Sequence, residues 1–204
     1  TATFKADPND SLLVLGDLTI TNGNLILLDD HYLTLTGNFK MDAGSFVPGS
    51  NVSHTVSGNW TESVGTTFEP TAGKFTFNAV GGNKTIITDA NAGGTENKFF
   101  DLYINSSNTV TANSALDIDG DFALTSGTFD PGNFEHDVAG NWTETLGTTF
   151  EATQGKFTFS GNNKTITTDA NASGTENKFF NLTISGNPVI AGSALDIDGD
   201  FALT

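Results

Sequence analysis

The pentapeptide Gly-Asn-Trp-Thr-Glu occupies residues 58–62 and returns unchanged at residues 140–144. Its opening step is a Gly, then Asn or Asp, then a large apolar residue, and this step recurs at Gly16, Gly37, Gly58, Gly120, Gly140 and Gly199. The first three glycines are equally spaced, Gly120 and Gly140 have almost the same spacing, and each of the two long gaps is close to three short ones. A fixed period of about 20 residues is typical of a repeat architecture.

Short stretches of alternating apolar and polar residues precede the glycine steps. Leu33 and Leu35 come before Gly37, and His54 and Val56 come before Gly58. A period of two predicts β-strands, and the clusters of Gly, Asn, Asp, Ser and Pro between these stretches predict turns.

A unit of about 20 residues with two or three short strands cannot bury their apolar faces alone, so successive units must stack. The sequence therefore predicts an all-β fold, a parallel β-solenoid that runs continuously through residues 1–204 with rungs of about 20–21 residues. Roughly ten rungs at a rise of ~4.8 Å would give a rod of roughly 48 Å. A β-sandwich is the rival architecture, but it does not explain the fixed spacing of the glycines.

A larger repeat is superimposed on the small one. Residues 58–77 match residues 140–159 at 16 of 20 positions. Two further pairs of segments match at nearly the same offset, namely 84–104 with 164–184 and 115–125 with 194–204. We predict larger units at approximately 37–119 and 120–198, each of about four rungs, with partial units in the remainder.

The composition excludes several classes of function. Eight Lys, no Arg and 24 acidic residues give a net charge of −16, which repels nucleic acid and anionic lipid. The chain contains no Cys, so disulfides and cysteine metal sites are absent. No apolar run approaches the ~20 residues needed to span a bilayer, and we expect no membrane insertion.

Four motifs carry a resemblance to a known class: Gly-Asn-Trp-Thr, Gly-Thr-Thr-Phe, Lys-Phe-Thr-Phe and Phe-Phe-Asn-Leu-Thr-Ile. They are similar to the right-handed β-solenoid repeats of large secreted bacterial surface proteins, including filamentous-haemagglutinin-like adhesins. The resemblance implies a right-handed coil and a non-enzymatic role outside the cell or at its surface, in a filament, a stalk or adhesion. It implies no particular site residues.

When the rungs are aligned through the glycine step, equivalent positions of successive rungs form a column. Leu12, Leu33 and His54 then share one column, and Leu116 and His136 share a column later in the chain. The two histidines would lie four rungs apart, roughly 19 Å at ~4.8 Å a rung, which is too far for a shared metal. We expect each histidine to hydrogen-bond the backbone of a turn.

The glycine step also aligns polar residues between rungs. Asp17, Asn38 and Asn59 share a column, and Asp121 lies beside Asn141. An amide both donates and accepts hydrogen bonds, so we interpret these residues as a structural ladder.

The densest group of carboxylates is Asp117, Asp119 and Asp121, which returns as Asp196, Asp198 and Asp200. Asp137 should lie beside Asp117 one rung later. An EF-hand is excluded, because Gly stands at the fourth place and no Glu closes the loop. Two interpretations remain: a solvated acidic face, or a weak calcium site at Asp117, Asp119, Asp121 and Asp137. We expect no other cofactor.

The longest polar segments are residues 88–98 and their near copy at residues 168–178. They should bulge from the rod, either as binding loops or as the product of a recent duplication. No catalytic constellation is unique, because every polar feature is periodic. An ice-binding surface would need a long column of Thr, and Thr76 and Thr158 are single members.

These observations predict a non-enzymatic, extracellular structural repeat protein, part of a surface filament, stalk or fibre. Its partners would be further copies stacked head to tail or neighbouring repeats of a longer chain. An adhesin that binds a glycan or a cell surface is the main alternative. An ice-binding solenoid and a polysaccharide-active enzyme are weaker ones.

Overall fold

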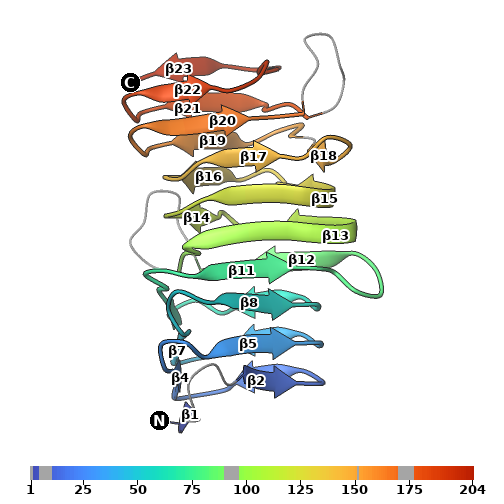
Figure 1. Cartoon of the computed structure of the whole chain (residues 1–204), viewed down its shortest axis with the longest axis vertical. Helices are drawn as coiled ribbons and strands as arrows, with labels where there is room; N and C mark the ends of the chain where they lie inside the picture. Colours follow the sequence, from blue (N-terminus) through green and yellow to red (C-terminus); the bar gives the residue numbers. More distant parts are fainter. Residues whose placement is uncertain (1, 5–10, 90–96, 151, 170–176) are drawn as a thin grey trace.

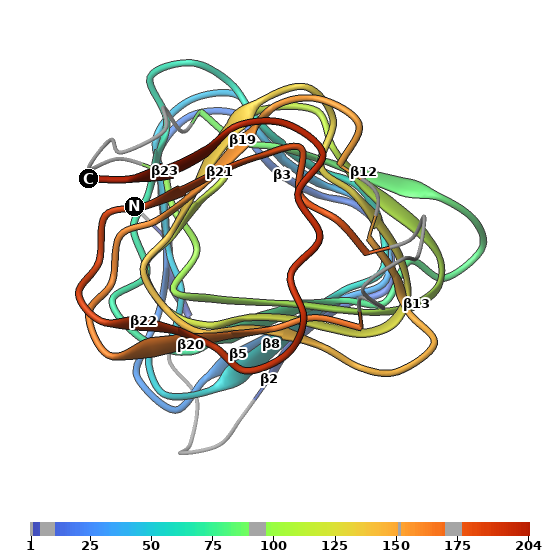
Figure 2. The ribbon, with the colours of Figure 1, turned by 90° about the horizontal axis from the view of Figure 1, so that it is seen from above.

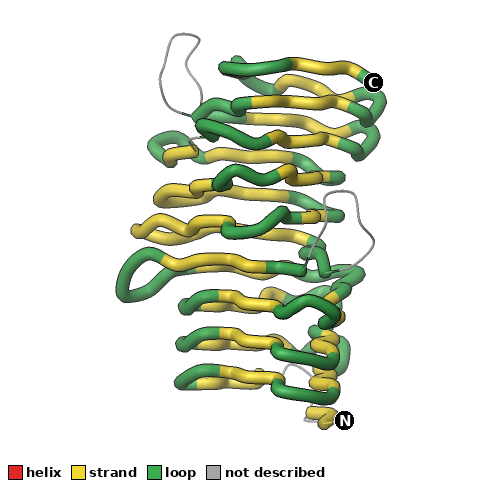
Figure 3. The backbone as a smooth tube through the Cα atoms, turned by 180° about the vertical axis from the view of Figure 1, so that it is seen from behind, coloured by secondary structure: helices red, strands yellow, loops and turns green. Residues whose placement is uncertain are grey.

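The computed structural model describes residues 2–4, 11–89, 97–150, 152–169 and 177–204. All regular structure in these ranges is β, and the strands stack as a β-solenoid, which confirms the predicted fold class (Figure 1). Seen along the axis, the chain coils around a three-sided section (Figure 2). The ends of the chain lie at opposite ends of the stack (Figure 3). None of the described residues forms a helix, and hence none of them forms a helix able to cross a membrane.

The first side of the coil holds a four-stranded and a five-stranded parallel sheet. Between the two sheets, Lys98 donates its backbone N–H to Phe68 O, and Phe99 pairs with Ile118. The strands of this side are β1 (Ala2–Phe4), β4 (Asn24–Leu27), β7 (Ser45–Val47), β10 (Thr67–Phe68), β14 (Asp117–Ile118), β16 (Glu135–Val138), β19 (Lys156–Phe159), β21 (Asn181–Ile184) and β23 (Phe201–Leu203).

The other two sides belong to one 14-stranded sheet, because two long strands, β13 (Asp101–Ala112) and β15 (Phe122–Asp130), continue from one side to the next. The second side also holds β2 (Ser11–Val14), β5 (Tyr32–Leu35), β8 (Ser53–Val56), β11 (Lys74–Phe77), β17 (Trp142–Glu144), β20 (Lys164–Thr167) and β22 (Val189–Ala191). The third side holds β3 (Leu18–Ile20), β6 (Phe39–Met41), β9 (Trp60–Glu62), β12 (Lys84–Ile87) and β18 (Thr149–Phe150).

The coil makes about eight turns, so the prediction of roughly ten rungs was too high. Early turns have the expected length, since Leu33 lies beside Leu12, one short period before it. Turns that include the long polar segments take more chain, because Leu102 lies beside Phe75 and Leu182 lies beside Phe157. About eight steps of ~4.8 Å give a rod of roughly 40 Å.

The larger repeat does not return to the same side of the coil. Trp60 lies in the column of Phe39, on the third side. Its equivalent Trp142 lies beside Phe122, in the column that passes through Leu102 to β11, on the second side. The larger unit is therefore three turns and two sides long, slightly short of four full rungs, so the second copy begins on a different side of the coil. The long polar segments and the loops of varied length change the number of residues in each rung of the coil.

A continuous apolar core fills the coil, and it contains two groups of contacting aromatic rings, one from Phe39 to Phe99 and one from Phe122 to Phe179. The ring of Trp60 stacks on Phe39 with centroids 3.8 Å apart, and that of Trp142 stacks on Phe122 at 4.0 Å. All four side chains are fully buried. Full burial of one large apolar side chain contributes about 1.5–3 kcal/mol, so these two stacked pairs, one on the third side and one on the second, are a main source of stability.

The glycine step is explained by close approach of the chain at two corners of the coil. The corner between the second and third sides holds Gly37 and Gly58, and the corner between the first and second sides holds Gly120 and Gly140. A Cβ on Gly58 would lie 2.2 Å from Gly37 O, and a Cβ on Gly140 would lie 1.9 Å from Gly120 O. Only Gly lets neighbouring rungs meet at this spacing. The recurring glycines therefore set the rung period that the sequence shows.

Candidate functional site

His54 and His136 both have structural roles, as the sequence predicted. His54 is fully buried, its Nδ1 accepts the Leu33 backbone N–H at 3.0 Å, and its Nε2 donates to Gly49 O at 3.0 Å. His136 makes the same two contacts with Leu116 and Pro131. Burial lowers the pKa of each histidine to about 4, so both are neutral near pH 7.

The predicted polar ladder is also present. Asp17 Oδ1 accepts the backbone N–H of Asn38 at 2.7 Å, and Asn38 Oδ1 accepts that of Asn59 at 2.9 Å. In the second stretch, Asp121 Oδ1 accepts both the backbone N–H and the side-chain amide of Asn141. These side chains satisfy corner N–H groups that the strands leave unpaired.

The four aspartates of the predicted calcium site are only partly brought together. Asp117 and Asp137 lie side by side on β14 and β16, and Asp119 forms an ion pair with Lys98. Burial raises the pKa of Asp117 to about 7, and the charges of Asp119 and Asp137 add to this effect. Asp121, by contrast, is engaged in the ladder with Asn141.

Other groups already contact this acidic cluster. Ser160 donates its hydroxyl to Asp137 at 2.6 Å, and Lys98 neutralises one carboxylate. Within the described ranges, no group of three or more His, Asp or Glu side chains is arranged to hold a metal ion. Calcium binding at these aspartates stays a prediction.

A pair of buried glutamates was not found by the sequence analysis. Trp60 Nε1 donates to Glu62 Oε1 at 2.5 Å, and Trp142 Nε1 donates to Glu144 Oε1 at 2.6 Å. Burial raises the pKa of both glutamates to about 7, partly offset by these hydrogen bonds. Because residues two apart on a strand share a face, the sequence Trp-Thr-Glu could have revealed that each Glu points inward with its Trp.

The flanks of the long polar segments are tied to the turn before them. Asp89 accepts the backbone N–H of Gly65 at 2.6 Å, and the buried Asn97 accepts that of Phe68 at 2.7 Å. The second copy repeats both contacts through Asp169 and Asn177. Residues 90–96 and 170–176, which form most of the two predicted protruding segments, lie outside the described residues.

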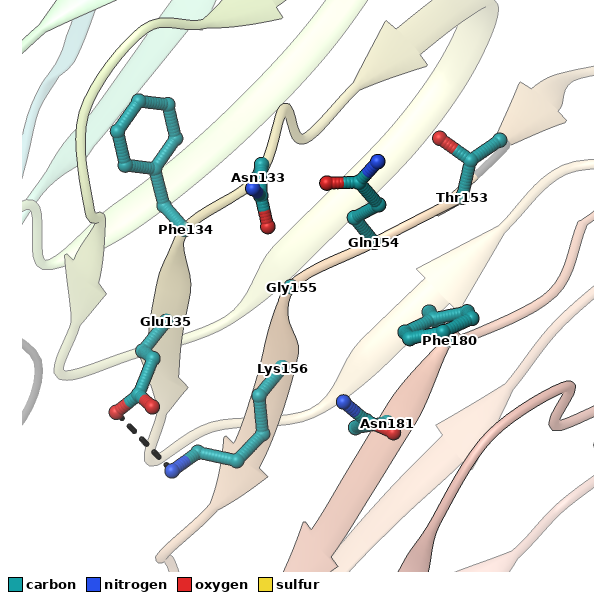
Figure 4. Close-up of a pocket in the computed structure, with 9 residues that line it drawn as sticks. All are labelled: Asn133, Phe134, Glu135, Thr153, Gln154, Gly155, Lys156, Phe180 and Asn181. Atoms are coloured by element: carbon teal, nitrogen blue, oxygen red, sulfur yellow. Dashed lines mark ion pairs between the residues drawn. The ribbon is translucent and has the colours of Figure 1, made fainter.

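A groove of about 710 Å³ lies on the first side of the coil (Figure 4). Its lining comes from three successive rungs and includes two phenylalanine rings, three side-chain amides, a glycine at the floor and one ion pair. The lining residues are Asn133, Phe134, Glu135, Thr153, Gln154, Gly155, Lys156, Phe180 and Asn181. Glu135, Lys156 and Asn181 are neighbours in the strand register. Lys156 Nζ lies 3.0 Å from Glu135 Oε2.

A second groove, of about 480 Å³, occupies the equivalent place in the first copy of the repeat. Its Gly73, Lys74 and Phe100 correspond to Gly155, Lys156 and Phe180. Here the ammonium group of Lys74 lies over the ring of Tyr103, 4.5 Å from its centroid. The second copy has the small Thr183 in place of this tyrosine, so one groove is partly filled by a ring that the other lacks.

The chain matches no protein-family model, no curated protein and no solved structure.

Proposed function

We propose that this chain is a non-enzymatic structural segment of an extracellular filament, stalk or fibre, and that its rungs associate end to end. The observation that carries the proposal is the exposure of core positions at the last rung. Phe201 lies directly beside Leu182, which is fully buried, yet Phe201 is 54% exposed. Leu203, beside Ile184, is 71% exposed.

These side chains occupy columns that are buried in the earlier rungs. At the first described rungs, Leu12 and Leu18 are likewise only partly buried, although both occupy core columns. The strands β22 and β23 each pair on one edge alone among the described residues. An apolar face with an unpaired strand edge is a template for further β-structure.

The carboxylates in the larger groove and beside the core tryptophans agree with a non-enzymatic role. The larger groove is lined by a single carboxylate, Glu135, which is paired with Lys156. Glycoside hydrolysis generally uses two carboxyl groups across the scissile bond. The buried Glu62 and Glu144 face tryptophans in the core, away from solvent.

The likeness of the repeats to those of secreted bacterial surface proteins supports a place outside the cell. The β-solenoid architecture agrees with that class, and the acidic composition agrees with an extracellular rod. Filamentous-haemagglutinin-like adhesins are one such group, and adhesion is the second function that we consider for this chain.

Sedimentation velocity over a concentration series tests end-to-end association. We expect the mass of the 204-residue chain to grow with concentration, and the double variant Phe201→Lys/Leu203→Lys to suppress this growth. The matched control is Val64→Lys/Leu146→Lys, since both residues are highly exposed but lie at turns on the flanks of the coil. A monomer at every concentration, or equal suppression by the control, would contradict association of copies through their ends.

A further inference from the structure

We propose that the groove beside Phe180 binds an uncharged oligosaccharide. This inference goes beyond the structural role, because it gives one flank of the rod a ligand. It commits to a site, made by Phe180 with Gln154, Asn181 and Lys156, and to a chemical class. Recognition of a glycan would make the rod both a spacer and a binding surface.

The lining of the groove has the chemistry that a pyranose ring requires. Phe180 is half-buried and lies one rung above Gly155, with Gln154 and Asn181 on either side (Figure 4). A sugar has an apolar C–H face that packs on an aromatic ring and a rim of hydroxyl groups. The amides of Asn133, Gln154 and Asn181 each donate and accept hydrogen bonds, which suits such a rim.

The shape of the groove is prepared by the backbone. Gly155 has φ of +80° and forms the floor, where a Cβ would come 2.5 Å from Phe134 O. Asn181 Oδ1 accepts the Asp200 backbone N–H at 2.8 Å, which fixes the orientation of this amide. The volume of about 710 Å³ falls within the range of small-molecule sites, ~300–1,000 Å³.

Charge selects the class of sugar. The charged residues in the lining are Glu135 and Lys156, and they neutralise one another at 3.0 Å. The whole chain carries a net charge of −16, which repels uronic and sulfated glycans. Neutral hexose and N-acetylhexosamine units fit both conditions.

The first copy of the repeat provides an internal comparison. Its groove keeps the glycine floor, the lysine and the phenylalanine, but Ala72 replaces Gln154 and Asp101 replaces Asn181. Tyr103 lies beneath Lys74 and occupies part of the space. The groove at Phe180 should therefore bind the sugar, and the groove at Phe100 should bind it much more weakly.

Calorimetric titration with defined hexasaccharides tests this proposal: cellohexaose, mannohexaose, xylohexaose and chitohexaose as neutral probes, and hexagalacturonate as the charged probe. We expect at least one neutral probe to bind with a dissociation constant on the order of 1 mM or tighter, and hexagalacturonate not to bind. Thr183→Tyr, which imports the ring of the first copy, should weaken binding at least about tenfold, as should Phe180→Ala. Phe100→Ala should leave binding unchanged.

Melting curves of each variant show whether it folds, and Thr183→Tyr keeps the test decisive should Phe180→Ala unfold, because Thr183 faces outward beside Thr158. Absence of binding to every neutral probe would overturn the proposal. So would binding that Thr183→Tyr and Phe180→Ala leave intact, or binding of the charged probe alone. The result is independent of association between copies, which sedimentation follows separately.

Discussion

The two copies of the larger repeat, residues 58–125 and 140–204, share their interior and differ on their exterior. The tryptophan-to-glutamate bond is 2.5 Å in one copy and 2.6 Å in the other, and the aspartate that follows accepts a turn N–H at 2.6 Å in both. Yet the copies start on different sides of the coil. The repeated sequence therefore forms the same interior contacts in both copies, although the two copies start on different sides of the coil.

The exteriors have diverged at a few positions. Lys74 lies over Tyr103, whereas the equivalent Lys156 pairs with Glu135. Outward residues contact solvent and their lateral neighbours, so they can change without disturbing the core. The comparison shows that the two copies share the interior that specifies the coil and differ in the contacts on their surface.

The largest expected effect comes from removal of the core tryptophans. Trp60→Ala and Trp142→Ala should each lower the free energy of unfolding by about 3–5 kcal/mol, because a cavity forms and a buried glutamate loses its donor. Equal interiors predict that the two losses agree within about 1 kcal/mol. Urea unfolding followed by circular dichroism measures both, and a variant that unfolds like the parent would show that its copy is not built as described.

The buried glutamates give the next largest effect, which depends on pH. The folded pKa of Glu62 and Glu144 is about 7, above the ordinary value of 4.5, so the folded state retains protons that the unfolded state releases between these values. The free energy of unfolding should therefore fall, by about 3 kcal/mol per glutamate, as the pH rises from 4.5 to 7. Asp117, with its pKa raised to about 7, acts in the same direction.

His54 and His136 act in the opposite direction. Their folded pKa is about 4, below the ordinary 6.5, so stability should rise between pH 4 and 6.5 as the unfolded state loses protons. In the variant Glu62→Gln/Glu144→Gln, the free energy of unfolding should visibly rise between pH 4 and 6.5. In the variant His54→Gln/His136→Gln, its fall between pH 4.5 and 7 should become steeper. The midpoint of urea unfolding, measured from pH 4 to 8, distinguishes the variants. If the midpoints of both variants and of the parent chain change with pH in parallel, the assigned effects of the glutamates and histidines are wrong.

The asparagines that anchor the polar segments should have smaller effects. Asn97→Ala leaves the buried backbone N–H of Phe68 without its acceptor, and Asn177→Ala does the same to Phe150. Each change should reduce the free energy of unfolding by about 1–3 kcal/mol. Amide hydrogen exchange at Phe68 and Phe150 should accelerate in the matching variant only. Unchanged exchange would mean that these side chains do not anchor the rung.

The smallest effects sharpen the contrast between the two lysines. Lys74→Met removes a cation–π contact and Lys156→Met removes an exposed ion pair, so each should change the free energy of unfolding by about 1 kcal/mol or less. Added salt should weaken the contribution of Lys156. Thermal melts of both variants in low and high salt measure how much each lysine contributes to stability. If the contributions of Lys74 and Lys156 respond equally to salt, the two contacts do not differ in kind.

Much of the interior could be predicted from the sequence, because it depends on local rules. The glycine spacing indicated the rung, the alternation indicated the strands, and alignment of rungs placed His54 beside Leu33 and Asn38 beside Asp17. Each of these contacts joins positions that are one rung apart in a run of constant turn length.

The position of the second copy could not be predicted in the same way. The separation of Trp60 and Trp142 along the chain is close to four short periods, but longer turns such as that from Phe75 to Leu102 absorb part of it. The groove at Phe180 was missed for a related reason. It combines residues from three rungs that are distant in the sequence, and their outward side chains have no periodic signature.

The central claim, that rungs associate end to end into a structural rod, is tested most directly by electron microscopy of the purified chain at increasing concentration. The account predicts rods of constant cross-section whose lengths are multiples of about 40 Å, the length of one coil. In Phe201→Lys/Leu203→Lys the lengths should collapse to a single unit. Particles that stay at one unit for the unmodified chain, or that grow sideways into sheets, would contradict the claim.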